Sequence, residues 1–339
     1  MRAVLMQSGR LCVEDVVDPL PQRGEVLVKS LACGICGSDL HALKHTDDFI
    51  RTSRETGGAF KLTSNSPVVL GHEFCAEILE HGPGSSKVLK VGTRVCSVPA
   101  LPGPNGTIPI GYSDRAPGGF AEYIRVPSTW VIRCPENLTT KQSMMIGTAG
   151  LTAGLCIAKI EQQLSLDSLK VIVSGATGGV SSIAIKILYN LGAKVTGITG
   201  KNNEEKFLKE IGCSEIIHRQ EFIKSTRLPL NKGLYDAAVD VAGGNILSCI
   251  IASMKYNGII TACGNVAGPK LETTVFPFIL RGNQLVGIDS ATSSIKLREQ
   301  VWNNFSSIWE LNDLHRICKT ISLNDLPFEI KKILQGKIT

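Results

Sequence analysis

Hydrophobic residues in roughly the first 130 positions fall in short alternating runs that are separated by Pro and Gly. Residues 26–31 alternate after Pro21 and Gly24, and this pattern predicts a strand. Further strands are expected at 68–71, 76–79 and 94–98. Residues 39–60 are polar and read as helix or loop, while 99–119 are rich in Pro and Gly and read as loop. The first part of the chain is therefore predicted to be a β-rich domain.

The pattern changes near Thr139, where Thr139 or Thr140 is placed to cap a helix that reaches Gln163. Apolar strand patterns then alternate with helical ones. Strands are expected at 171–174, 193–198, 236–241, 258–263 and 285–288, and helices at 180–191 and 204–211. This order predicts a doubly wound parallel sheet, hence an α/β fold. We expect a first domain over 1–125, completed by about 276–339, and a second over 126–275.

A glycine loop joins the strand at 171–174 to the helix that follows it. With Gly178 as the middle glycine of a G-x-G-x-x-G pattern, Ala176 and Ser181 occupy the outer positions, and both are small. Such a loop lets the backbone approach a pyrophosphate at a helix N-terminus, although any tight strand-to-helix turn carries similar residues. Because this loop opens a βαβ unit, it predicts a dinucleotide site formed by Thr177, Gly178, Gly179 and Val180.

The end of the second strand indicates which dinucleotide binds. NAD-binding folds usually place an Asp or Glu there, about 20 residues after the loop, to bind the ribose 2′-hydroxyl. Here the segment reads Thr199, Gly200, Lys201, without an acid. Lys201 offers a charge-assisted contact to a 2′-phosphate, unless it is only a solvated lysine at a helix start. The sequence favours NADP(H) over NAD(H).

Cys36, His72 and Glu73 are candidate ligands of one zinc ion. A thiolate, an imidazole and a carboxylate would leave one position for water or substrate, and such an open site activates an alcohol or polarises a carbonyl. The alternative is the Cys33-x-x-Cys36 pair, but no second pair of that spacing follows it. A hydrogen-bonded histidine and a buried thiol would explain the same residues without a metal.

The run Gly34-Ile-Cys-Gly-Ser-Asp-Leu-His41, with Gly71-His-Glu73, resembles the zinc-containing alcohol dehydrogenases. The resemblance implies a GroES-like catalytic domain with Cys36 and His72 as zinc ligands and Glu73 on or near the metal. It further implies that Ser38 passes a proton from the zinc-bound alcohol, His41 continues the relay, and Asp39 orients the histidine ligand.

The second half resembles a different branch of the same superfamily, the NADPH-dependent acrylyl-CoA reductases, which share the fold but lack zinc. The segments that carry this resemblance are 146–153, 174–180, 199–201, 262–268 and 274–290. The resemblance implies a Rossmann cofactor domain in which Thr148 approaches the nicotinamide and Asn265 lies on a loop beside it.

The two resemblances meet near residues 125–145, and the junction affects the metal site. Zinc alcohol dehydrogenases commonly take a third ligand at the position that Gly147 occupies here, and neither Gly147 nor its neighbours Ile146 and Thr148 bind zinc. No cysteine lies between Cys96 and Cys134, so a structural zinc lobe with four cysteines is not expected. One catalytic zinc and no structural zinc are predicted.

Bulk composition narrows the function further. The chain has 339 residues, 43% hydrophobic and 19% charged, with a net charge of +6 that is spread along the sequence, so a nucleic-acid-binding stripe is not indicated. Eleven cysteines, several of them in apolar runs, together with a start unlike a signal peptide, favour the reducing cytoplasm. The sequence contains no run of 18 apolar residues, so no membrane-spanning helix is predicted.

These observations predict an enzyme that acts on a small molecule, as a homodimer or homotetramer, without nucleic-acid or membrane partners. The favoured function is zinc-dependent, NADP(H)-linked interconversion of an alcohol with an aldehyde or ketone. The alternative is a zinc-independent, NADPH-dependent reductase of activated double bonds of the acrylyl-CoA, enoyl-CoA or quinone type. A non-catalytic member of the superfamily is disfavoured, because Ser38, Asp39 and His41 stand together beside Cys36.

Overall fold

The structure, a computed structural model, describes residues 1–48, 50–51, 66–100, 109–113, 116–226, 228–309, 311 and 318–335. The chain forms two compact units. The first contains 1–148, 291–302 and 313–339, and the second contains 149–290 and 303–312. The expected division placed 126–148 in the second domain and 276–290 in the first. The boundaries differ because β8 completes the sheet of the first unit, while β14 pairs with β13 in the second.

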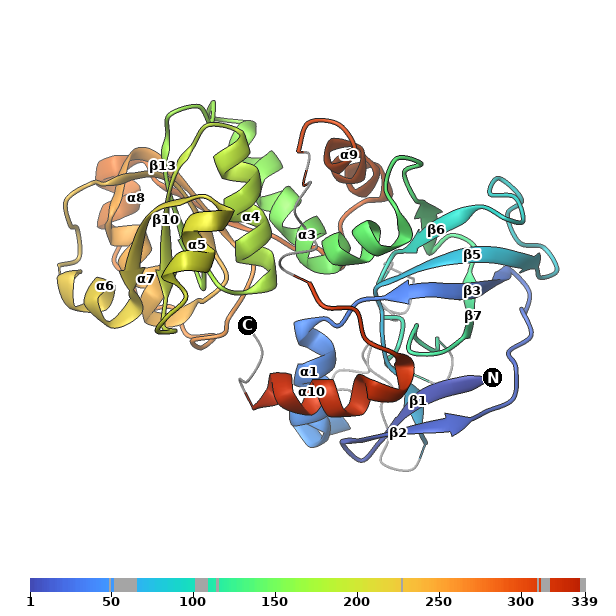
Figure 1. The fold of residues 1–339 in the computed structure, drawn as a ribbon. Coiled ribbons are helices and arrows are strands. Elements are labelled where there is room, and N and C mark those ends of the chain that lie inside the picture. Colours follow the sequence, from blue (N-terminus) through green and yellow to red (C-terminus); the bar gives the residue numbers. More distant parts are fainter. Residues whose placement is uncertain are drawn as a thin grey trace. The chain divides into compact units, whose positions relative to one another are not determined.

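The first unit is built on two antiparallel sheets (Figure 1). The larger has the order β7-β3-β5-β6-β8 and consists of Tyr123–Pro127, Glu25–Cys33, Phe74–His81, Arg94–Ser97 and Val131–Arg133. The smaller has the order β2-β1-β4 and consists of Arg10–Asp15, Arg2–Gln7 and Val68–Val69. The helices of this unit among the described residues include α1 (Gly37–Lys44), η2 (Leu323–Asp325), α10 (Leu326–Leu334), the first part of α3, and α9 (Ile295–Phe305) up to Trp302.

Alternation along the strands separates the two faces of the larger sheet. Phe74, Ala76 and Ile78 of β5 join Val95 of β6 and Ile124 of β7 in one buried apolar cluster. The intervening residues point to the opposite face. The strands expected at 26–31, 76–79 and 94–98 are therefore confirmed as β3, β5 and β6, with small shifts at their ends.

The second unit contains one six-stranded parallel sheet of order β11-β10-β9-β12-β13-β14. Its strands are Cys213–His218, Lys194–Thr199, Lys170–Ser174, Tyr235–Asp240, Met254–Ala262 and Gln284–Gly287. The helices are α4 (Gly179–Asn190), α5 (Glu205–Ile211), α6 (Arg219–Ser225), α7 (Gly244–Ala252) and α8 (Phe276–Arg281), with the second part of α3. The predicted doubly wound sheet is confirmed, and helices cover both of its faces (Figure 1).

The strand order reverses between β9 and β12, which are neighbours in the sheet although β10 and β11 lie between them in sequence. At such a reversal the connecting helices leave toward opposite faces, and a crevice opens at the carboxyl ends of the strands. Ligands of open parallel sheets bind in this crevice. The residues that end β9 and β12 are therefore placed to form a binding site.

Helix α3 (Thr140–Glu161) has two segments that meet at Gly147, where the backbone angles are φ 48° and ψ −151°. Thr139 caps the helix, because its Oγ1 accepts a hydrogen bond from Gln142 N at 3.2 Å while Gln142 Oε1 accepts one from Thr139 N at 3.0 Å. Among the described residues α3 alone is long and apolar enough to cross a membrane, but 67% of its most apolar window is buried inside the protein. This burial and the kink are what a core helix shows.

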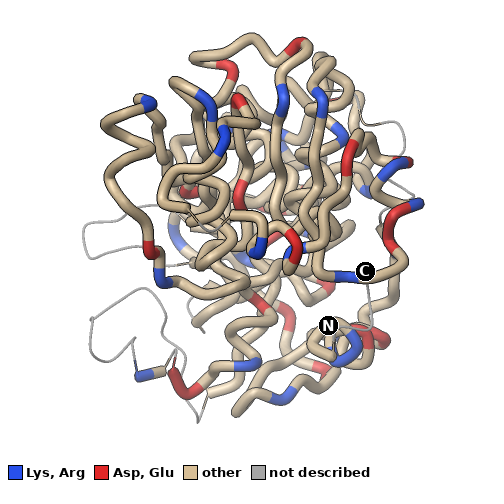
Figure 2. The backbone as a smooth tube through the Cα atoms, turned by 90° about the vertical axis from the view of Figure 1, so that its left-hand side faces the viewer, with Lys and Arg blue, Asp and Glu red and all other residues tan. Residues whose placement is uncertain are grey.

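Charged residues of both signs are interspersed along the chain (Figure 2). Examples are the exposed pairs Lys209–Glu205 and Lys270–Glu272, with N–O distances of 2.6 and 2.5 Å. Exposed pairs of this kind contribute at most about 1 kcal/mol each.

Candidate active site

Ser38, His72 and Asp39 form a hydrogen-bonded series in the first unit. His72 Nε2 lies 3.4 Å from Ser38 Oγ, and His72 Nδ1 lies 3.2 Å from Asp39 Oδ1. The second carboxylate oxygen, Asp39 Oδ2, accepts a hydrogen bond from Cys36 N at 3.0 Å, at the start of α1. The ring of Tyr112 stacks on His72 with a centroid distance of 5.9 Å. A buried carboxylate therefore orients an imidazole whose other nitrogen faces a hydroxyl.

Local backbone contacts fix the position of His72. Gly71 has φ +93°, and a Cβ there would lie 2.9 Å from the backbone N of Phe120, so the turn requires glycine. On the other side, Ser97 Oγ donates a hydrogen bond to the His72 carbonyl at 2.7 Å and accepts one from Phe74 N at 3.0 Å. The backbone of His72 is thus fixed on both sides of the residue.

Burial and charge act in opposite directions on His72. Burial lowers the pKa of His72, but the Asp39 carboxylate and Cys36 raise it, and the net pKa lies well above the usual value. Burial raises the pKa of the Glu73 carboxyl, although the His72 charge and the N–H of Thr148 act against this shift. Among the groups that raise the pKa of His72, the Asp39 carboxylate acts most strongly, because it pairs with the imidazole directly.

Glu73 binds the backbone at the kink of α3. Its Oε2 accepts a hydrogen bond from Thr148 N at 2.5 Å, directly after the kink. A Cβ at Gly147 would lie 2.8 Å from Glu73 Oε2, and a Cβ at Gly34 would lie 2.7 Å from Glu73 Cδ. Two glycines thus leave the room that the carboxylate fills. A carboxylate beside the first N–H groups of a helical segment stabilises that segment.

Replacing Glu73 with alanine is expected to lower the free energy of unfolding by roughly 1.5–3 kcal/mol, because the partly buried N–H of Thr148 loses a charged acceptor. Glu73→Gln keeps an acceptor oxygen of the same reach and is expected to lose less than about half as much. Chemical denaturation of both variants and the parent chain measures the difference. Equal losses in the two variants would contradict a backbone-capping role.

The predicted zinc ligands converge only in part, because the side chain of Cys36 interacts with His72 while the Glu73 carboxylate is directed to Thr148 N. The donor atoms of Cys36, His72 and Glu73 do not all lie within 4.8 Å of one another. The reason is local, since the Glu73 carboxylate is directed to Thr148 N and His72 Nε2 faces Ser38 Oγ. Across the part of the chain that the structure describes, the group that meets this criterion consists of Cys75, Cys96 and Cys134. The residues of the sequence motif, as arranged here, do not fit a three-ligand zinc centre.

The glycine loop of the second unit has the form that a pyrophosphate requires. Gly175 has φ +59°, and a Cβ there would lie 2.7 Å from Val241 Cγ2. Gly178 is the N-cap of α4 and has no side chain to occupy the first N–H groups of the helix. At the third position of the motif, Ser181 Oγ donates a hydrogen bond to Ser174 O at 2.7 Å, so this serine packs where glycine is usual.

Ser174 and Asp240 join the carboxyl ends of β9 and β12 beneath this loop. Ser174 Oγ donates a hydrogen bond to Asp240 Oδ1 at 2.6 Å, and Val241 N donates one to Ser174 Oγ at 3.0 Å. Asp240 Oδ2 accepts a hydrogen bond from Gly243 N at 2.8 Å. Both side chains are fully buried, and burial raises the pKa of the Asp240 carboxyl despite its hydrogen bonds. This network fixes the floor of the crevice.

The end of β10 carries the residues predicted to select the cofactor. Thr199 Oγ1 accepts a hydrogen bond from Lys201 N at 3.1 Å. The side chain of Arg219, the first residue of α6, lies against Gly200, where a Cβ would be 2.8 Å from Arg219 Cζ. Two cationic side chains therefore flank Gly200. The exposed Arg219 is distant in sequence, so the motif around Lys201 did not indicate it.

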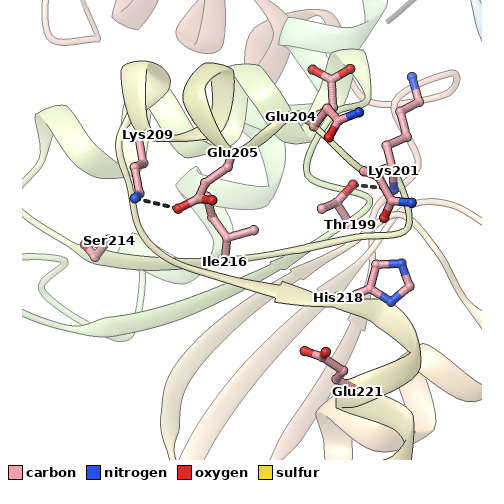
Figure 3. A pocket seen from close by; sticks show the side chains of 11 residues that line it. Thr199, Lys201, Glu204, Glu205, Lys209, Ser214, Ile216, His218 and Glu221 are labelled. Atoms are coloured by element: carbon pink, nitrogen blue, oxygen red, sulfur yellow. Dashed lines mark hydrogen bonds and ion pairs between the residues drawn. The ribbon is translucent and has the colours of Figure 1, made fainter.

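An open pocket of about 440 Å³ adjoins this segment (Figure 3). Lys201 and Thr199 lie together at one end, while Lys209 pairs with Glu205 at the other. The lining residues are Thr199, Lys201, Asn202, Asn203, Glu204, Glu205, Lys209, Ser214, Ile216, His218 and Glu221.

The remaining predicted residues lie in three places. Thr177 is half-buried and Gly179 is exposed in the glycine loop and first turn of α4, where Val180 follows. Asn265 is exposed on the loop after β13, and its carbonyl accepts a hydrogen bond from Gly268 N at 2.9 Å. His41 lies on α1 with its ring 4.6 Å from that of His45. The relay role of His41 and the nicotinamide contacts of Thr148 and Asn265 stay predictions.

Two family models match the chain in the regions just described. The alcohol dehydrogenase GroES-like domain matches residues 22–136, and the zinc-binding dehydrogenase domain matches residues 179–307. Acrylyl-CoA reductase AcuI of Ruegeria pomeroyi is 34% identical over 222 residues, which are 65% of this chain and 67% of the relative. YhfP of Bacillus subtilis, which is named as a quinone oxidoreductase, is 39% identical over 65% of this chain and 68% of its own.

Solved structures of similar proteins superpose on nearly the whole length of this chain. YhfP with NAD bound superposes with a TM-score of 0.86 at 30% identity, over 99% of this chain and 96% of that one. The yhdH oxidoreductase of Salmonella enterica in complex with NADP gives a TM-score of 0.81 at 28% identity, over 100% and 98%. The fold and the dinucleotide site define an NAD(P)-dependent oxidoreductase. The chain belongs to the medium-chain dehydrogenase/reductase family.

Proposed function

We propose that this protein is an NADPH-dependent reductase of activated carbon–carbon double bonds, of the enoyl-CoA or quinone type, that works without zinc. The engagement of the Glu73 carboxylate by Thr148 N carries the proposal, because it removes one of the three predicted metal ligands. The relatives named as an acrylyl-CoA reductase and a quinone oxidoreductase support the same class of reaction.

The residues present fit a phosphorylated dinucleotide. The first turn of α4 offers N–H groups to the pyrophosphate, and the glycines of the loop allow its close approach. Lys201 and Arg219 flank Gly200 at the end of β10, where a carboxylate would select NAD. Two cations at this position favour the 2′-phosphate of NADPH, because each offers a charge-assisted hydrogen bond.

The bound cofactor supplies a hydride to the β-carbon of the substrate, and the chain supplies the proton that completes the reduction at the α-carbon. Ser38 holds a hydroxyl proton in hydrogen-bonding reach of His72 Nε2, and Asp39 stabilises the positive charge on the imidazole. When Ser38 donates its proton, His72 replaces it from Nε2, so the net transfer is one hydride and one proton across one double bond. General acid assistance of this kind contributes about 10²–10⁴ in rate.

Paired substrates test the proposal. NADPH oxidation with crotonyl-CoA is expected to exceed that with butyraldehyde, which has a carbonyl but no activated double bond, by at least about tenfold in kcat/KM, a difference of about 1.4 kcal/mol. Treatment with a strong chelator, followed by metal analysis, is expected to leave the rate with crotonyl-CoA unchanged. Loss of this activity on chelation, with recovery on added zinc, would contradict the proposal.

Zinc-dependent alcohol oxidation is the second candidate. The Asp39–His72 hydrogen bond favours it, because a carboxylate on the remote ring nitrogen is the usual support of a metal-binding histidine. This candidate requires about one zinc per chain, lost in Cys36→Ser. The zinc content of the same preparation separates the two candidates. For the zinc-free reductase, less than about a tenth of an equivalent of zinc per chain is expected.

A further inference from the structure

Three cysteines come together on neighbouring strands of the larger sheet in the first unit. Cys75 of β5 is the direct register partner of Cys96 of β6. Cys134 follows the last residue of β8, and its N–H donates a hydrogen bond to Arg94 O at 3.0 Å. Because Cys96 is paired with Ile132, Cys134 stands diagonally across from Cys96. The three thiols therefore lie next to one another on the sheet, although their segments are far apart in sequence.

The sulfur atoms are close enough to bind one ion. All three Sγ atoms lie within 4.8 Å of one another. A zinc–sulfur bond length of about 2.3 Å sets the sulfur–sulfur distance around one ion at roughly 4 Å. To bring the sulfur atoms from separations of up to 4.8 Å to roughly 4 Å, each must move by less than about 1 Å. Small changes of the cysteine side-chain torsion angles allow such movements.

The thiols are shielded from water. Cys75, Cys96 and Cys134 are 0%, 1% and 2% exposed. They alternate with Phe74, Ala76 and Val95, which belong to the apolar cluster on the opposite face of the sheet. Single buried cysteines behave as small apolar residues, and Cys249 on α7 is an example of one in this chain. Three converging thiols are a donor set, because packing alone does not require sulfur at three touching positions.

The surroundings provide a positive charge and one hydroxyl. Arg94 lies two residues before Cys96 on β6, hence on the same face, and donates hydrogen bonds to Leu138 O at 2.8 Å and Glu136 O at 3.2 Å. Ser143 is fully buried on α3, and its hydroxyl donates to Thr140 O at 2.8 Å. The guanidinium compensates part of the charge that thiolates carry.

We propose that Cys75, Cys96 and Cys134 bind one soft monovalent d¹⁰ metal ion, Cu(I), through three sulfur atoms. Thiolate ligands select soft ions such as Cu(I) and Zn(II). Structural zinc takes four ligands, whereas the group within 4.8 Å on the described part of the chain holds three. Binding replaces the thiol protons, which are released to solvent, and involves no change of oxidation state. The site is independent of the reductase activity and of the Cys36 motif.

Anaerobic titration of the reduced full-length protein with Cu(I) tests the proposal, with a Cu(I) chelator present as competitor. About one equivalent is expected to bind per chain, with the ultraviolet absorption of a copper thiolate and an X-ray absorption spectrum that reports three sulfur neighbours. Cys96→Ala and Cys134→Ala are each expected to weaken binding at least about tenfold. Cys249→Ala, which removes a buried thiol elsewhere, and Cys36→Ser, which removes the motif thiol, are expected to leave it unchanged.

The titration of the parent chain decides the matter even where a core variant folds poorly. Bound Cu(I) is expected to raise the thermal unfolding temperature of the parent chain, because a ligand that binds the native state stabilises it. Binding of less than about a tenth of an equivalent overturns the proposal. Loss of binding in Cys36→Ser with retention in a folded Cys96→Ala overturns it as well, and so does a preference for Zn(II) over Cu(I) in direct competition.

Discussion

Replacing Lys201 and Arg219 together with alanine is expected to raise the KM for NADPH by about 100-fold and to change the KM for NADH less than about threefold. Each charge-assisted contact to the 2′-phosphate contributes roughly 1.5–3 kcal/mol, and about 1.4 kcal/mol corresponds to tenfold in affinity. Arg219 lies against Gly200 and Lys201 follows it in sequence, so both side chains are expected to reach the same phosphate. Initial-rate measurements with the two cofactors give the comparison.

A matched control is Lys206→Ala, which removes an exposed cation of α5 outside the pocket lining. It is expected to leave both KM values within about twofold of the parent chain, because an exposed charge at that distance is screened by salt. An equal rise in the KM for NADPH and in the KM for NADH in the double variant would show that Lys201 and Arg219 do not bind the 2′-phosphate. Equal affinity of the parent chain for the two cofactors would show the same.

Replacing Asp240 with alanine is expected to destabilise the second unit by roughly 3–5 kcal/mol. The substitution leaves the buried hydroxyl of Ser174 and the N–H of Gly243 without their acceptor, and each unsatisfied group costs about 1–3 kcal/mol. A loss of this size lowers the unfolding temperature by on the order of 10 °C.

Asp236→Ala on the same strand is the control for Asp240→Ala. Its carboxylate is partly exposed and pairs with Lys255 at 2.8 Å, an interaction that contributes about 1 kcal/mol or less. Calorimetry of the two variants tests the ranking. A shift for Asp240→Ala no larger than that for Asp236→Ala would contradict the assignment of Ser174 and Asp240 as the floor of the crevice.

The parallel sheet was predictable because its strands are short apolar runs between glycines and helical patterns. The strand at β9 and the helix at α4 begin within one residue of the expected positions. The boundary between the units was harder to predict. In the sequence, β14 is only a short apolar run at 285–288, and its pairing with β13 is what assigns it to the second unit. Sequence patterns report local periodicity, whereas unit boundaries depend on which strands pair.

The candidate active site was likewise predictable only in part. The contact between Asp39 and His72 followed from the resemblance to a known motif. The direction of the Glu73 carboxylate did not, because it depends on the absence of side chains at Gly34 and Gly147 and on the kink that frees Thr148 N. A donor residue in a motif becomes a ligand only where other groups leave its oxygen available.

The Ser174–Asp240 pair was missed for a related reason. The two residues are 66 positions apart and meet only because β9 and β12 are neighbours in the sheet. Each ends an apolar strand, and a polar residue at the end of a strand beside a glycine loop was the available signal. Arg219 was missed because α6 begins far from the Thr199–Lys201 segment in sequence.

The fate of the hydride tests the central claim most directly. NADPH labelled with deuterium at either of the two transferable positions of the nicotinamide is incubated with crotonyl-CoA and the enzyme, and the product is analysed by mass spectrometry and NMR. We predict that one of the two labelled cofactors places deuterium on the β-carbon of the saturated acyl chain. Absence of deuterium from the acyl chain of crotonyl-CoA, while butyraldehyde under the same conditions gives butanol with deuterium on its carbinol carbon, would contradict the assignment of this protein as a reductase of activated double bonds.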